Sequence, residues 1–181
     1  MKMNANQLIS ELENYTKNHL EKAEKFKNQP IENLTQRPTP ESWNVLECLE
    51  HLNRYGDFYI PEMRRKMDNS FYPISKDFKS GILGNYFAQM MLPKEKLNKM
   101  KTMKKTNPLH QELDKNVIDK FIQQQQELLN LLEVAKVKNL NKIKTGISIS
   151  NWIQLKLGDT FRVVIYHNER HVQQAEKALL F

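Results

Sequence analysis

Cysteine is almost absent from this sequence, because Cys48 is the single one in the chain. One cysteine excludes an internal disulfide framework, and such sparse use fits the reducing conditions of the cytosol. We therefore expect a cytoplasmic protein that is stabilised by its hydrophobic core. With 181 residues the chain is long enough for one such core and short for two, so a single domain over residues 1–181 is predicted.

Long apolar runs and glycine are also scarce. No stretch of about 18 consecutive apolar residues occurs, so no transmembrane helix is expected. No apolar segment follows Met1 to Asn4, so no signal peptide is expected either. Only five glycines are present, whereas 39% of the residues are hydrophobic and 27% are charged. This composition is typical of a helix-rich, soluble globular protein, for which a membrane is not an expected partner.

The charge balance is basic, with a formal net charge of +7. Much of the excess lies in one run, which contains Lys94, Lys96, Lys99, Lys101, Lys104 and Lys105 against Glu95 alone. Nucleic-acid interfaces favour arginine for hydrogen bonds to base edges and aromatic side chains for stacking. The run lacks both, so we interpret it as a solvated surface and do not expect nucleic acid as a partner.

Hydrophobic residues recur at helical spacing in four segments, at about 4–27, 44–67, 112–136 and 158–180. Start signals support three of them: Asn4 and Asp159 are candidate N-caps, and Asn44 followed by Glu47 has the pattern of a capping box. Pro61 is expected to bend or end the second segment. Four amphipathic helices of this length predict an all-α fold that packs as a four-helix bundle.

The connections between these segments differ in length. Residues 68–109 form the longest one, which is too apolar to be disordered and holds a short predicted helix near 81–91. Its length is sufficient for a crossover of the bundle, which would leave the second and third helices parallel. Residues 138–156 are expected to be irregular, with Trp152 as a packing anchor.

Histidine supplies the candidate functional residues. His167 and His171 are four residues apart in a helical segment, so their imidazoles lie on one helix face and can bind the same metal ion. His51, two turns into the second helix, is the candidate third ligand. Each of these histidines taken alone is better interpreted as a core residue, as is His19 in the first helix. Cys48 is either an additional ligand or a small buried hydrophobic residue.

Two motifs taken together indicate a family. They read Trp43-Asn44-Val45-x-Glu47-x-Leu49-x-His51-Leu52 and, far downstream, His167-x-x-x-His171-x-x-Gln174. In order and spacing this pattern resembles the DinB-like superfamily over nearly the whole chain. The resemblance implies a four-helix bundle with a long crossover between helices 2 and 3, in which three histidines hold a divalent metal ion. It implies His51, His167 and His171 as the ligands, and Gln174 matches a frequent glutamine one turn after the last of them.

Three neutral imidazole ligands leave the charge of a divalent ion uncompensated. Such an ion is a strong Lewis acid, which can lower the pKa of bound water toward about 7 or hold a thiol in its thiolate form. Imidazole suits zinc, nickel, iron or copper, so the identity of the metal stays open. The second ring nitrogen of each ligand needs an acceptor, and Glu47, Asp57 and Glu169 are the candidates near in sequence.

The resemblance also bears on function, since characterised members of the superfamily include thiol S-transferases and isomerases that use low-molecular-weight thiols such as bacillithiol or mycothiol. It implies a metal-dependent enzyme that adds a small thiol to an electrophilic small molecule, and a homodimer as its assembly. A metal-dependent hydrolase is the alternative reaction. A non-catalytic metal-binding protein and a metal-free helical interaction module are the other two interpretations.

Overall fold

A computed structural model describes residues 1–93 and 102–181 of the chain. Over these residues the protein is mostly helical, which confirms the predicted helical fold, and two small sheets accompany the helices. The lysine-rich run from Lys94 to Lys101 lies outside the described residues. At its end Lys104 and Lys105 are exposed and belong to the 3-10 turn η1 (Lys104–Thr106).

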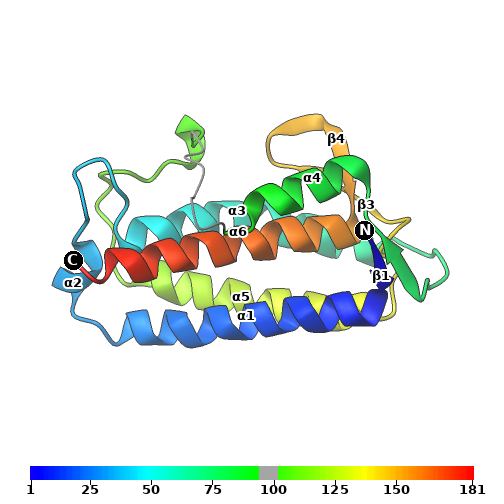
Figure 1. Ribbon diagram of the computed structural model, residues 1–181, viewed down its shortest axis with the longest axis horizontal. Coiled ribbons are helices and arrows are strands. Elements are labelled where there is room, and N and C mark those ends of the chain that lie inside the picture. The colour runs from blue at the N-terminus through cyan, green and yellow to red at the C-terminus, as the bar shows by residue number, and fades with distance from the viewer. Residues whose placement is uncertain (94–101) are drawn as a thin grey trace.

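Four long helices make up most of the structure. They are α1 (Ala5–Lys27), α3 (Val45–Asp68), α5 (Asn116–Ala135) and α6 (Leu157–Ala178), close to the four predicted segments. In Figure 1 they run along the same long axis, and α1 and α3 each contact both α5 and α6. The short helix α2 (Ile31–Thr35) follows α1. Helix α4 (Ile82–Met91) matches the short helix expected in the long connection, and it packs against α6.

Two antiparallel strand pairs lie outside the helices. They are β1 (Lys2–Asn4) with β2 (Asp77–Lys79), and β3 (Lys144–Ile147) with β4 (Ser150–Lys156). The prediction that residues 138–156 are irregular is therefore wrong. Ile153 and Leu155 pack against the core, and Trp152 alternates with them along the strand. Trp152 is consequently 95% exposed, and its prediction as a packing anchor is wrong as well.

The predicted starts of α1 and α3 are confirmed. The side chain of Asn4 accepts hydrogen bonds from the backbone N–H groups of Asn6 and Gln7. Both halves of the capping box at the start of α3 are present, because Asn44 accepts from the N–H of Glu47 and Glu47 accepts from the N–H of Asn44. These local bonds set where α3 begins, and thereby the position of every residue that follows on it.

One local prediction is corrected by tertiary packing, and of the two outcomes expected at Pro61, a bend or an end of the helix, the end is excluded. Asp159 is not an N-cap, because α6 begins two residues earlier, and its buried carboxylate instead accepts a hydrogen bond from the N–H of Gly81 at 2.8 Å. Pro61 does not end α3, which continues to Asp68. Beyond Pro61, the side chains of Met63 and Met67 are fully buried, and their packing stabilises the last turns of the helix.

The apolar core has two parts that meet along α3 and α6. One includes buried residues of 59–67 in α3 and of 161–166 in α6, whereas the other includes residues of 45–52 in α3 and of 172–178 in α6. The stretch of α6 between the two parts contains His167 and His171. Apolar packing therefore lies on both sides of these two histidines along α6. None of the helices in the described part of the chain is both long and apolar enough to cross a membrane.

Candidate metal centre

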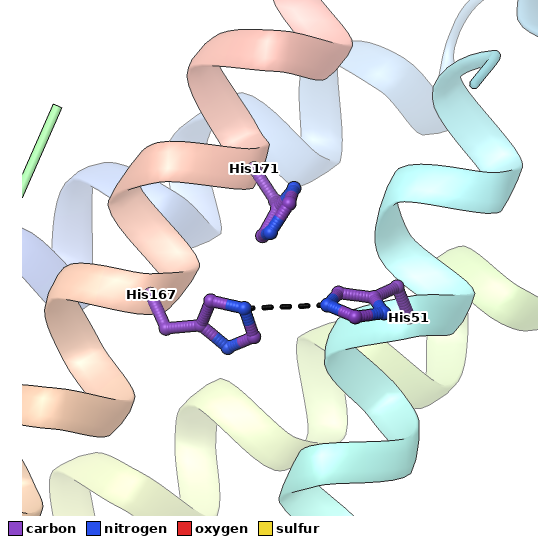
Figure 2. A group of neighbouring side chains, drawn as sticks. All are labelled: His51, His167 and His171. Carbon is purple, nitrogen blue, oxygen red and sulfur yellow. Dashed lines mark hydrogen bonds between the residues drawn. The ribbon is translucent and has the colours of Figure 1, made fainter. Parts of the chain in front are cut away.

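Three histidine side chains converge between α3 and α6 (Figure 2). His51 comes from α3, and His167 and His171 come from successive turns of α6. The Nε2 atoms of His51 and His167 are 3.2 Å apart, and one ring nitrogen of each of the three side chains lies within 4.8 Å of the other two. The structure therefore brings together all three residues that the sequence indicated.

Burial keeps these imidazoles uncharged. Desolvation lowers the pKa of His51 to about 4 and that of His171 to about 3, and it holds the pKa of His167 well below its ordinary value. The positive charge of Arg54 lowers the pKa of His51 further, and that of Arg170 acts in the same way on the other two. Because the neutral imidazole is the form that binds metal ions, all three side chains are in the ligand form near pH 7.

Two of the rings have their second nitrogen bound to an acceptor. The Nδ1–H of His51 donates to the backbone carbonyl of Thr106 at 2.7 Å, and the Nδ1–H of His171 donates to Oε1 of Gln174 at 2.9 Å. A carbonyl oxygen only accepts, so each of these neutral rings carries its proton on Nδ1. The Nε2 atoms of His51 and His171 are then unprotonated, so each has the lone pair that a metal ion would bind. The Nε2 atom of His51 accepts the hydrogen bond from Nε2–H of His167.

This donor set fits a divalent metal ion. Histidine nitrogens bind zinc at about 2.0–2.1 Å, which places two nitrogens of a tetrahedral site roughly 3.3 Å apart. The 3.2 Å between His51 and His167 matches that spacing. Across residues 1–93 and 102–181, these two and His171 form the only group of three or more His, Cys, Asp or Glu side chains close enough to share an ion.

A family model described as the DinB superfamily matches residues 15–175, a span that includes both motifs. The chain belongs to the DinB superfamily. The resemblance seen in the sequence is thereby confirmed. The superfamily is associated with metal ions, and the three histidines could hold one, whose identity stays open. No curated protein and no solved structure gave a match.

Aromatic rings line the histidine cluster of this DinB-superfamily protein. The ring of Trp43 is centred 4.6 Å from that of His51 and 5.4 Å from that of His171. On another side, Tyr55 is centred 4.7 Å from His167 and 5.0 Å from His51. These rings replace water around the imidazoles, which accounts for their low pKa values and would strengthen electrostatic interactions within the site.

The acidic residues predicted to orient the ligand rings have other partners, so that prediction is wrong. Glu169 accepts from Nε2 of the buried His19 in α1 at 2.8 Å, and Asp57 pairs with Lys120 in α5. Glu47 completes the capping box at the start of α3. Glu169 follows a ligand by two residues, and on a helix that spacing places it on a different face. The interpretation of His19 as a core residue is confirmed.

The sequence indicated one of the two acceptors that orient the ligand rings, Gln174, and gave no signal for the other, Thr106. Gln174 follows His171 by one helical turn, and this spacing was visible in the motif. Thr106 is separated from His51 by 55 residues and lies in a connection without helical periodicity, so no sequence signal pointed to it. Cys48 is fully buried in the apolar core, and burial raises the pKa of its thiol. It is a small hydrophobic residue and not a fourth member of the cluster.

Proposed function

We propose that this protein is a metal-dependent enzyme in which His51, His167 and His171 hold a divalent ion such as zinc, nickel or iron. The convergence of three buried, uncharged imidazoles carries the proposal. When bound, an ion with three neutral ligands keeps its full charge and supplies a Lewis acid that stabilises an anionic sulfur or oxygen atom. We also infer that the four long helices form a four-helix bundle with a crossover between α3 and α5, as one domain.

The reaction that we infer is the transfer of a low-molecular-weight thiol to a small electrophile. The sulfur atom forms a bond to the electrophilic carbon, the leaving group departs from that carbon with the bonding electrons, and the thiol proton passes to solvent. Trp43 and Tyr55 line the site, and their rings would pack against the apolar part of the electrophile. The predicted homodimer and cytoplasmic location stay predictions.

Two observations support a thiol rather than water as the attacking group. Activation of water commonly uses a general base within hydrogen-bonding reach, and the buried carboxylates nearest the ligands in sequence, Glu47 and Glu169, are bound elsewhere. A thiol has a pKa of about 8.5 and loses its proton far more easily. The positive charges of Arg54 and Arg170, which act on the histidines, also favour a thiolate.

The thiol has to come from another molecule. Cys48 is the only cysteine of the chain, and its side chain is fully buried in the apolar core. Burial raises the pKa of this thiol, so its nucleophilic thiolate form is suppressed. A diffusible thiol that enters the histidine site is therefore the co-substrate that the chemistry requires.

Metal analysis tests the site. Protein purified without a histidine tag is expected to contain one equivalent of metal, and His51→Ala, His167→Ala and His171→Ala are each expected to lose it. His19→Gln is the matched control, because it alters a buried histidine outside the cluster and should retain the metal. A wild-type protein without stoichiometric metal would overturn the proposal.

Turnover assays test the reaction. Metal-loaded protein would be incubated with a chromogenic aryl halide and a panel of low-molecular-weight thiols, and in parallel with ester and amide substrates. Thiol-dependent turnover that is absent in His171→Ala supports the transferase. Ester or amide hydrolysis without a thiol would refute the transferase and favour the hydrolase.

A further inference from the structure

Residues 103–111, here called the strap, cross the site next to His51. The strap includes η1, and its Thr106 carbonyl accepts the Nδ1–H of His51. Asn107 in the strap also accepts the indole N–H of Trp43 through Oδ1 at 3.1 Å. The strap therefore contacts both a candidate ligand and a ring that lines the site. A backbone carbonyl orients a ligand only when its own segment is held in place, so the groups that hold the strap matter to the site.

Arg54 holds the strap on both sides of Thr106. Its guanidinium donates to the backbone carbonyls of Lys105 at 3.3 Å and of Asn107 at 3.5 Å, and it also donates to Oε1 of Gln111. Arg54 lies on α3 almost one turn after His51, so the helix that supplies the ligand also supplies the group that holds its acceptor. The planar guanidinium suits this arrangement, because its five donors point in fixed directions.

Glu47 holds the far end of the strap. Its Oε1 accepts the N–H of His110 at 2.6 Å, and the other oxygen completes the capping box of α3. His110 has a φ of 62°, which is in the left-handed region that a residue with a side chain disfavours. Such a backbone persists only where surrounding contacts determine it. The start of α3 thus helps to impose the path of the strap.

We propose that Arg54 is a positioning residue of the metal centre, which acts through the Thr106 carbonyl to hold the His51 ring with Nε2 toward His167. This inference rests on the proposed metal site. Groups that orient metal-binding histidines from outside change metal affinity by about 10- to 100-fold. Loss of Arg54 releases residues 105–107, and the imidazole of His51 then loses its fixed orientation.

Zinc affinity, measured by competition with a chromophoric chelator, tests the proposal. Arg54→Met keeps the aliphatic stem and removes all donors, whereas Arg54→Lys keeps the charge but lacks the planar fork. Arg64→Met is the matched control, because Arg64 lies on the same helix and pairs with Glu127 at the surface. Both Arg54 variants are expected to bind zinc about 10- to 100-fold more weakly, and Arg64→Met as tightly as the wild type. Equal affinities of Arg54→Met and Arg64→Met would overturn the proposal.

A second measurement uses the metal-free protein. The Nδ1–H proton of His51 is expected to exchange slowly in nitrogen-15 NMR spectra of the wild type and of Arg64→Met, and rapidly in Arg54→Met. This readout separates the two proposals: if the wild type takes up no zinc, the proposed function fails, and the exchange rate still decides the role of Arg54. If Arg54→Met does not fold, Arg54→Lys takes its place, and exchange and affinity equal to those of Arg64→Met would overturn the proposal.

Discussion

Acid is expected to destabilise the metal-free protein through its three clustered histidines. Burial lowers the pKa of His51 to about 4, that of His171 to about 3, and that of His167 well below its ordinary value. In the unfolded chain the pKa of each returns to about 6.5. Below that pH the unfolded state binds protons that the folded state does not. The stability is thus fully present above about pH 6.5 and is lost as the pH falls toward the folded pKa values.

The size of the loss follows from these pKa values. Each histidine that stays neutral in the folded state costs about 1.4 kcal/mol per pH unit below 6.5. At pH 5 this is about 2 kcal/mol for one histidine and about 6 kcal/mol for the three. Because a folded domain is stabilised by only about 5–15 kcal/mol in total, the metal-free protein is expected to be close to unfolding at pH 5.

Urea unfolding in the presence of a chelator, followed by far-UV circular dichroism at pH 7.5 and pH 5.0, measures this loss. Replacing His51, His167 or His171 singly by glutamine should reduce the difference between the two pH values by about 2 kcal/mol each. A wild-type difference below about 2 kcal/mol would refute the reasoning. The same conclusion would follow if all three variants kept the full wild-type difference, since the protons would then bind elsewhere.

Three further predictions concern single side chains. Gln174→Leu removes the acceptor of the His171 Nδ1–H and should weaken zinc binding about 10- to 100-fold in chelator competition. Gln173→Leu is the control and should leave zinc affinity unchanged, because the Gln173 side chain bonds Glu169. Equal zinc affinities of the two variants would contradict the role of Gln174 as the acceptor of His171. Gly56→Ala would place a Cβ atom 2.1 Å from Oε1 of the buried Gln124. The free energy of unfolding should fall by about 1–3 kcal/mol, which is measured as a lower urea midpoint. An unchanged midpoint would contradict this prediction, because it would show that the Gln124 side chain moves aside without cost. Cys48 should resist a thiol-reactive dye in the folded protein and react in urea, because it is fully buried; labelling without urea would disprove this.

Several features of the fold were readable from the sequence because they are local. The four long helices follow from apolar residues at helical spacing, and the capping box of Asn44 and Glu47 depends on two residues within one turn. The pairing of His167 with His171 on one face is likewise a property of a single helix. Such features are encoded within a few residues, so one stretch of sequence contains the whole signal.

The local predictions that failed were overridden by packing. Asp159 has the chemistry of an N-cap, yet it is buried against the N–H of Gly81 from another segment. Trp152 is large and apolar, yet its strand position places it on the solvent face. For Asp159 the neighbour that decided the outcome, Gly81, is 78 positions away in the sequence. For Trp152 it is the packing of Ile153 and Leu155 against the core that turns the opposite face of the strand to solvent.

By itself the sequence determined the helical class of this protein, its membership of the DinB superfamily and the shared face of two imidazoles. The family resemblance also named His51 as the third ligand, but only the tertiary structure shows its contact with His167 across 116 positions of the chain, and sets Thr106 against His51 across 55. It also decided that the three rings are neutral. The physical reason is that solvent exclusion and hydrogen-bond partners belong to the packed chain, and both arise from contacts between segments that no local pattern specifies.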